Sequence, residues 1–455
     1  MSDSRSLFGT DGVRGTANLY PMTASMALRL GQAAAFVFRG RRDGGHRILI
    51  GKDTRLSGYM FEDALAAGIS SMGGTVLQVG PMPTPALAFL TVDMRCDAGV
   101  MITASHNAYQ DNGIKFFGSD GFKLDDNIEH RIEELVLSDG ISSHLAPPDE
   151  VGPASRIDDA TGRYVVFLKK TFPKEHSLDG LRIVLDCANG AGYKVGPLVL
   201  QELGAEVFTL GVEPNGRNIN LGCGSLHPEK TVEKVLELRA DVGIAVDGDA
   251  DRVVIVDETG AILDGDDLMA LCARDMLERG VLRGNGVVAT VLSNLGLERA
   301  LAAEGLDLIR TQVGDRYVVD AMRSGGYNLG GEQSGHVVFL DETTTGDGLM
   351  SALQVLGAMI RKNRPLSELT GGFERFPQQM LNVPVAERTP LEELTEFQAL
   401  LRKVEADLGD RGRVLIRYSG TELKARVMVE GEDEARVREL AAELAAELER
   451  AHASA

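Results

Sequence analysis

One supersecondary pattern recurs three times along the chain and constrains its fold more than any other feature. In each copy an apolar run of strand length precedes a longer helical pattern, which ends at a glycine before a second apolar run. The copies occupy 47–80, 182–208 and 287–309. Strands that alternate with helices predict βαβ crossovers and mainly parallel sheets. We therefore expect three related α/β domains.

The C-terminal part of the chain shows a different pattern. Short apolar runs at 414–416 and 427–429 are typical of strands, and they flank a polar loop at 417–423. A helical pattern follows from about 432 to 450, and its period predicts one buried stripe. Two strands followed by a long helix predict a small α+β domain. The residues expected to form the stripe are Val437, Leu440, Ala441 and Leu444.

Polar or proline-containing stretches mark the candidate linkers. They lie near 147–153 and 374–377. A chain of 455 residues has room for about three domains, and the repeats together with the C-terminal segment suggest four. The expected domains are 1–154, 155–257 and 258–373, all α/β, and 374–455, which is α+β.

The charge balance limits the partners of the chain. With 47 Lys and Arg against 67 Asp and Glu, the formal net charge is −20. Nucleic acids and anionic lipid surfaces are bound through clustered Lys and Arg, so we expect no nucleic acid and no membrane as a partner. An anionic substrate would need a local cationic pocket or a metal ion. The sequence does not determine the oligomeric state and leaves a homodimer open.

The cysteines carry no metal or disulfide signature. Cys96, Cys187, Cys223 and Cys272 form no Cys-x-x-Cys pair, which argues against zinc, iron–sulfur and thioredoxin-like sites. Free thiols indicate a reducing compartment. The first residues lack the apolar core of a signal peptide, and the uncharged apolar runs are too short to cross a bilayer. We therefore expect a cytoplasmic protein.

A serine-containing loop at 103–115 follows the apolar strand pattern 99–102. A hydrolase nucleophile would sit on a Gly-x-Ser-x-Gly elbow, and the glycines are missing around Ser105. A phosphoryl carrier needs a hydroxyl at the end of a strand, near cations that offset the phosphate charge. His106 and Lys115 could supply these cations. The other interpretation is a polar βα loop with a capping serine.

Three aspartates alternate with small residues directly after the apolar strand pattern 242–246. Asp247, Asp249 and Asp251 would repel one another without a cation among them, and hard oxygen ligands suit Mg²⁺. A solvated acidic turn is the alternative. An EF-hand is disfavoured because Arg252 stands where its sharp turn requires glycine.

Two further loops have compositions that suit sugar and phosphate groups. The glycine-rich segment 330–336 carries Glu332 and Ser334, which could bind sugar hydroxyls. For His336 in the same segment, the usual interpretation is a structural role. The segment 417–422 combines small hydroxyl residues and glycine with arginine, and it is not a P-loop. A hairpin loop with surface arginines is the alternative there.

The four loops occur in an order that identifies a family. The chain resembles the α-D-phosphohexomutase superfamily over essentially its whole length, and within it the bacterial phosphoglucosamine mutases. The supporting segments are 8–15, 111–117, 218–220 with 223–225, and Gln333 within 331–336. The family usually has proline where Ala108 and Leu423 stand, which affects the stiffness of these loops more than their chemistry.

The resemblance implies a fold, an activity and a cofactor. The fold is four domains around a central cleft, with a TATA-box-binding-protein-like fourth domain. The activity converts glucosamine 6-phosphate into glucosamine 1-phosphate through a phosphoserine at Ser105 and a sugar bisphosphate intermediate, for UDP-N-acetylglucosamine and cell-wall synthesis. One Mg²⁺ per site would be held by the Ser105 phosphate and by Asp247, Asp249 and Asp251.

The resemblance also implies roles for the remaining loop residues. Arg14, Lys115 and Arg252 would offset phosphate charge, and His106 and Lys115 are candidates for proton transfer. Glu332 and Ser334 would bind sugar hydroxyls near His336. Gln333 would select the amino group, directly or by holding Glu332, or would pack under the loop. The expected site for the distal phosphate is Arg417, Ser419, Gly420, Thr421 and Arg426.

Two alternatives stay open at this point. A phosphoglucomutase or phosphomannomutase would share all four loops, and only the choice of sugar separates it. A non-catalytic sugar-phosphate-binding protein should lack the carrier serine or the acidic loop, and both are intact here.

Overall fold

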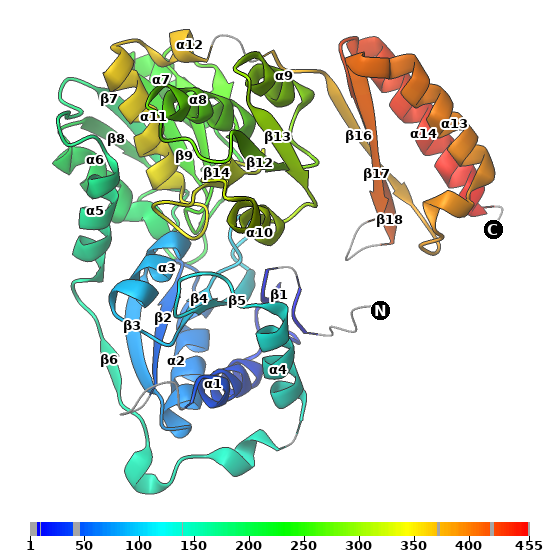
Figure 1. The fold of residues 1–455 in the computed structure, drawn as a ribbon. Helices are drawn as coiled ribbons and strands as arrows, with labels where there is room; N and C mark the ends of the chain where they lie inside the picture. Colours follow the sequence, from blue (N-terminus) through cyan, green and yellow to red (C-terminus); the bar gives the residue numbers. More distant parts are fainter. Residues whose placement is uncertain are drawn as a thin grey trace. The chain divides into compact units, whose positions relative to one another are not determined.

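The computed structural model of the chain describes residues 7–9, 11–39, 46–138, 140–370, 374–418 and 423–453. It divides into two compact units (Figure 1). The first contains Met1–Thr290 and Thr311–Gly371, and the second contains Val291–Arg310 and Gly372–Ala455. No helix among the described residues combines the length and the apolar character that crossing a bilayer requires.

The first sheet of the first unit has six strands in the order β1-β5-β4-β2-β3-β6 (Figure 1). A hydrophobic core lies between the sheet and three helices, α1 (Ala24–Phe38), α2 (Ser57–Ser71) and α4 (Asp126–Leu137). Helix α3 (Thr84–Asp93) packs against β2 and β4. The strands are β1 (Val13–Thr16), β2 (Arg47–Lys52), β3 (Thr75–Pro81), β4 (Ala98–Ile102), β5 (Asp111–Gly118) and β6 (Ala154–Arg156).

The second sheet has five strands in the order β11-β10-β9-β7-β8. Helix α7 (Glu229–Leu238) packs on β7, β9 and β10, while α6 (Val195–Glu202) packs on β8 and on α5 (Ala160–Thr171). The strands are β7 (Arg182–Asp186), β8 (Glu206–Leu210), β9 (Val242–Val246), β10 (Val253–Asp257) and β11 (Ile262–Leu263).

A third sheet in the same unit joins β12 (Gly286–Thr290), β14 (Leu329–Gly331) and β15 (Val337–Phe339). Helices α8 (Gly265–Glu278) and α10 (Asp315–Gly325) pack on it. Helix α11 (Gly348–Lys362) contacts β10 and β15, so it ties the second sheet to the third.

The second unit is a small α+β fold. Its sheet is antiparallel in the order β16-β18-β17, and α13 and α14 pack on it around a core that includes Phe397 and Leu444. The unit also contains α9 (Leu295–Ala303). The other elements are β16 (Gln378–Pro384), α13 (Thr395–Leu408), β17 (Gly412–Tyr418), β18 (Lys424–Gly431) and α14 (Glu434–Ala453).

The sheets of the first unit contain the predicted parallel neighbours together with antiparallel pairs, so they are mixed. Strands β2, β3 and β4 are parallel neighbours, as are β7 with β8 and β9, but β4–β5, β9–β10 and β14–β15 are antiparallel. The reason is loop length, because a parallel return needs a crossover of about a dozen residues and these pairs are joined by short loops. The serine, acidic and glycine-rich loops therefore connect strand to strand, not strand to helix.

Candidate functional site

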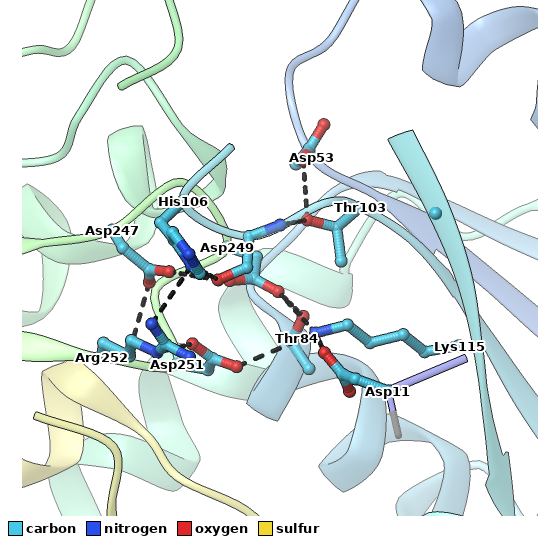
Figure 2. Close-up of polar contacts among 12 residues, drawn as sticks. Asp11, Asp53, Thr84, Thr103, His106, Lys115, Asp247, Asp249, Asp251 and Arg252 are labelled. Atoms are coloured by element: carbon cyan, nitrogen blue, oxygen red, sulfur yellow. Dashed lines mark hydrogen bonds and ion pairs between the residues drawn. The ribbon is translucent and has the colours of Figure 1, made fainter. Parts of the chain in front are cut away.

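Ser105 lies in the turn between β4 and β5, immediately past the end of a buried strand. Its side chain is almost fully buried, and its φ of 49° is in the left-handed region that a non-glycine residue rarely adopts. The backbone N–H of Ser105 donates to Thr103 Oγ1 at 2.9 Å. Thr103 Oγ1 in turn donates to Asp53 Oδ2 at 2.7 Å, and Figure 2 shows this chain of contacts.

The hydroxyl of Ser105 points into the acidic loop between β9 and β10. Its Oγ donates to Asp247 Oδ2 at 2.6 Å and lies 3.2 Å from His106 Nδ1. The two partners lie 142 residues apart in the sequence. The structure therefore brings the predicted carrier and the predicted metal ligands into direct contact.

The three aspartates of the acidic loop form one cluster. Each of Asp247, Asp249 and Asp251 offers a carboxylate oxygen, and these atoms all lie within 4.8 Å of one another. The loop achieves this because Ala250 at its centre has a φ of 57°. All three side chains are buried. The aspartates at alternate positions thus converge, as the metal interpretation requires.

The hydrogen bonding of this cluster fits a hard cation. Asp249 Oδ1 and Asp251 Oδ1 are buried and accept no hydrogen bond from any described residue. Burial, followed by the charges of Asp251 and Asp249, raises the pKa of Asp247 well above its ordinary value. Buried carboxylate oxygens without donors leave a strong demand for positive charge, and a divalent ion with oxygen coordination meets it.

Lysine and arginine side chains lie next to the aspartate cluster. Lys115 Nζ lies 3.1 Å from Asp11 Oδ2, 3.3 Å from Asp249 Oδ2 and 3.9 Å from Asp251 Oδ2 (Figure 2). Burial by itself would lower the pKa of Lys115, but the carboxylates of Asp11 and Asp249 outweigh it and raise that pKa. Arg14 binds the same carboxylate of Asp11. Lys115 is therefore a cation held between Asp11 and the acidic cluster.

His106 and Arg252 contact each other next to the serine. Arg252 Nη1 lies 3.1 Å from His106 Nδ1, as Figure 2 shows. Burial and the positive charges of Arg252 and Arg14 lower the pKa of His106 to about 4. The imidazole is consequently neutral near pH 7 while Ser105 carries no phosphate.

The glycine-rich loop between β14 and β15 reaches the acidic loop through His336. Its Nδ1 lies 3.6 Å from Asp251 Oδ2, and its Nε2 accepts the N–H of Gly346 at 3.0 Å. A ring nitrogen that accepts is unprotonated, so the proton of a neutral His336 is on Nδ1, facing Asp251. His336 is buried and supports the loop from behind.

The side chains at the tip of this loop are more accessible. Glu332 Oε1 accepts from the N–H of Gly314 at 3.2 Å, and Ser334 Oγ donates to Glu332 Oε2 at 3.2 Å. The backbone carbonyl of Gln333 accepts from Gly265 N–H at 3.0 Å. Ser334 is exposed and Glu332 and Gln333 are half-buried, so all three side chains can reach a ligand.

Two arginines of the predicted phosphate site are cross-strand neighbours in the second unit. Arg417 on β17 is paired with Arg426 on β18. Directly opposed side chains share one face of a sheet, and two like charges there repel. Burial and the charge of Arg426 lower the pKa of Arg417. An anion would relieve both effects. Ser419, Gly420 and Thr421 lie outside the described residues.

Sequence reasoning overlooked several residues of the site. Thr84, at the start of α3, donates to Asp249 Oδ2 at 2.6 Å. Asp11 accepts from Arg14 and Lys123 and is an ion-pair partner of Lys115. Asp11 lies inside the segment 8–15 that supports the family resemblance, so the sequence could have indicated it as a site residue. Nothing in the local sequence distinguishes Thr84 from an ordinary helix-initiating threonine.

Models of one family match consecutive parts of the chain. They are the phosphoglucomutase/phosphomannomutase alpha/beta/alpha domain I at 5–140, domain II at 162–260, domain III at 264–376 and the C-terminal domain at 380–447. The phosphoglucosamine mutase of Syntrophotalea carbinolica is 59% identical over 446 residues, which are 98% of each chain.

Solved structures share the fold. A phosphoglucomutase/phosphomannomutase family protein from Burkholderia thailandensis superposes with a TM-score of 0.79 at 23% identity, over 97% of each chain. The Aspergillus fumigatus N-acetylphosphoglucosamine mutase in complex with GlcNAc-6P and magnesium has a TM-score of 0.69 at 19% identity, over 98% of this chain and 96% of that one.

Proposed function

The chain belongs to the phosphoglucomutase/phosphomannomutase family, and we propose that it interconverts glucosamine 6-phosphate and glucosamine 1-phosphate. It is then an isomerase that moves a phosphoryl group within one sugar. The observation that carries the proposal is the 2.6 Å contact between Ser105 Oγ and Asp247 Oδ2, inside a convergent carboxylate triad flanked by Lys115.

The carrier would be phosphorylated Ser105. In the first half-reaction the free hydroxyl of the sugar attacks the phosphorus, the bond to Ser105 Oγ breaks, and the hydroxyl proton passes to a base or to Ser105 Oγ. The resulting sugar bisphosphate turns around. In the second half-reaction Ser105 Oγ takes the other phosphoryl group, and the released sugar oxygen takes a proton. Both steps depend mainly on position and charge.

We assign Mg²⁺ to the carboxylates of Asp247, Asp249 and Asp251, with the Ser105 phosphate completing the oxygen ligands. When bound, the ion would neutralise charge on the transferring phosphoryl group. Arg14, Lys115 and Arg252 would offset the charge that remains. Lys115, which lies within hydrogen-bond distance of Asp249, and His106 are the two candidates for proton transfer.

The remaining loops would hold the sugar in both orientations. Glu332 and Ser334 present a carboxylate and a hydroxyl for sugar hydroxyls, with Gln333 beside them and His336 as support. The opposed arginines Arg417 and Arg426 would bind the distal phosphate, together with Ser419, Gly420 and Thr421. Glucosamine 1-phosphate is a precursor for UDP-N-acetylglucosamine, so the reaction belongs in the cytoplasm.

The proposal is tested with purified protein and trace sugar bisphosphate. Turnover of glucosamine 6-phosphate should exceed that of glucose 6-phosphate and mannose 6-phosphate, and intact-mass analysis should find one phosphoryl group on Ser105. Faster turnover of glucose or mannose phosphate would make the chain a hexose mutase instead. Absence of all three activities would reject catalysis.

The metal assignment has its own test. Excess EDTA should abolish turnover and Mg²⁺ should restore it. The variant Asp249→Asn should need more Mg²⁺ for half-maximal rate, because it removes one anionic ligand from the cluster. Full wild-type activity in EDTA would contradict the assignment.

A further inference from the structure

A fully buried arginine lies beneath the loop that carries Ser105. Arg55 follows β2, is 0% exposed and forms an ion pair with Asp53 at 2.8 Å through Nε. Its Nη2 donates to the carbonyl oxygens of Ser105 at 2.9 Å and Asn107 at 2.8 Å. Its Nη1 donates to the carbonyls of Ala108 and Asp111, the latter at 3.0 Å. A guanidinium has five N–H donors, so every one is used.

Asn220, which lies between β8 and α7, is a second donor to the same loop. Asn220 Nδ2 donates to the carbonyl of Ser105 at 2.9 Å and to that of Asn107 at 3.0 Å. These are the same two oxygens that Arg55 Nη2 binds. Asn220 belongs to the segment 218–220 that helped to identify the family, and the reaction as described above gives this segment no role.

Two further hydrogen bonds join the turn that holds Arg55 to the chain around Asn220, whose own N–H donates to the carbonyl of Ala188 at 2.9 Å. Thr54 Oγ1 donates to the carbonyl of Asn189 at 2.6 Å, and Leu56 N–H donates to the carbonyl of Gly216 at 2.9 Å. The two donors are therefore parts of one framework, built from segments more than 130 residues apart. The framework surrounds the carbonyl side of the serine loop.

The loop needs this support because its conformation is unfavourable by itself. Ser105 has a φ of 49°, and such residues persist only where the surrounding structure over-determines them. A carbonyl that turned toward the phosphoryl group would repel its oxygens. Hydrogen bonds from Arg55 and Asn220 engage the carbonyls of Ser105 and Asn107, so these oxygens are not free to turn toward the phosphoryl group. Ser105 Oγ stays directed at Asp247.

We propose that Arg55 and Asn220 are positioning residues of the phosphoryl transfer: by sharing the carbonyl oxygens of Ser105 and Asn107, they hold the carrier oxygen in one place during both half-reactions. The inference rests on the proposed function. Neither side chain is proposed to touch the sugar. Removing either should slow the transfer step while leaving sugar binding nearly intact.

The main test is Asn220→Gly. Asn220 has a φ of 59°, which glycine adopts freely, so this change removes the side chain without straining the backbone. Its matched control is Asn363→Gly, at an exposed asparagine with a φ of 50° at the end of α11. The measurements are kcat, KM for glucosamine 6-phosphate, and the single-turnover rate at which isolated phosphoenzyme transfers its phosphoryl group to that sugar.

For Asn220→Gly we expect kcat and the single-turnover rate to fall about tenfold or more, with KM within about twofold, since small displacements of reacting atoms have large effects on rate. Asn363→Gly should match wild type in all three. A variant of Asn220 with wild-type transfer, or one whose only change is a higher KM, would overturn the inference.

Arg55→Lys gives a second and independent measurement. A lysine keeps the charge for Asp53 but has a single nitrogen with three donors, so it cannot bind four carbonyls. The same loss of transfer rate is expected from the fraction that folds, as judged by circular dichroism. If wild type itself transfers no phosphoryl group, the proposed function fails and this inference fails with it, whereas wild-type transfer with an unaffected Asn220→Gly rejects the inference alone.

Discussion

Ser105 is the residue on which the proposed chemistry depends most directly. Its side chain is small, almost fully buried and bonded to Asp247. Losing one hydroxyl leaves a gap of one atom, so Ser105→Ala should fold normally and keep its melting temperature within a few degrees. Turnover should fall by at least about a thousandfold, the scale seen when a nucleophile is removed.

Ser143→Ala is a suitable control for that variant, because Ser143 is exposed and its hydroxyl donates to the carbonyl of Gly140 in its own turn. Its kinetics should equal those of wild type. Near-normal turnover in Ser105→Ala would reject the phosphoserine mechanism.

Gln333 is the residue on which the choice of sugar is expected to depend. Its carbonyl is held by Gly265, so the half-buried side chain is presented from a fixed backbone. A hydrogen bond to a charged amino group is worth roughly 1.5–3 kcal/mol, which corresponds to about ten- to a hundredfold discrimination. Gln333→Met should therefore lower kcat/KM for glucosamine phosphate more than for glucose phosphate.

The measurement is the ratio of those two kcat/KM values in variant and wild type. A change of less than about twofold in this ratio corresponds to less than roughly 0.4 kcal/mol. It would show that Gln333 marks the family without selecting the sugar.

At the scale of elements, the N-terminus of helix α11 contacts the acidic loop and helps to fix its conformation. The N–H of Gly348, its first residue, donates to the carbonyl of Ala250 at 3.0 Å. A Cβ on Gly348 would lie 2.6 Å from the carbonyl oxygen of Arg252, which is closer than real contacts allow. Gly348→Ala should therefore displace the loop, and a higher Mg²⁺ concentration should be needed for half-maximal rate.

Gly162, in the first turn of α5, offers the matched comparison. Apart from the backbone of its own helix, no described residue has an atom within 4 Å of a Cβ added there. Gly162→Ala should stabilise the protein by about 0.4–1 kcal/mol through the lower entropy of its unfolded chain, and its Mg²⁺ dependence should be unchanged. Equal Mg²⁺ dependence in both variants would show that α11 does not position the loop.

At the scale of the first compact unit, Lys123 joins segments that belong to different sheets. It bridges Asp11, before β1, and Asp315, at the start of α10, the latter at 2.6 Å. Burial by itself would raise the pKa of both carboxyls. For Asp11 it is outweighed by Lys115, Lys123 and Arg14, and for Asp315 by Lys123 and His336, so both pKa values are lowered.

Lys123→Met should lower the free energy of unfolding at pH 7 by about 1–3 kcal/mol, because it leaves two partly buried carboxylates without this partner. A lowered carboxyl pKa contributes stability above the unfolded value of about 3.9 and loses it as pH falls through the folded value. The difference from wild type should therefore stay nearly constant from pH 7 to about 4 and shrink as pH falls below about 4.

Urea unfolding at about pH 7, 4 and 2.5 measures this difference. Lys234→Met is the control, since Lys234 pairs with Glu237 on the surface and the change should cost less than about 1 kcal/mol at every pH. A difference for Lys123→Met that stays constant with pH would contradict the electrostatic explanation.

Local patterns were sufficient for many elements and for the chemistry-bearing loops. The strand expected at 242–246 is β9, and the stripe of Val437, Leu440, Ala441 and Leu444 is buried in a helix. These predictions rest on period and on residue type, which act between near neighbours. The family relationship, and with it the activity, also followed from the order of the loops in the sequence.

The antiparallel partners, and the contacts between distant loops, were decided by the tertiary structure. Ser105 meets Asp247 across 142 residues, and Arg55 and Asn220 converge on one pair of carbonyls from separate segments. Local periodicity contains no information on such contacts, because they depend on which strand ends lie side by side in the folded chain. The sequence by itself determined which groups could react, and packing decided which of them meet and what holds them there.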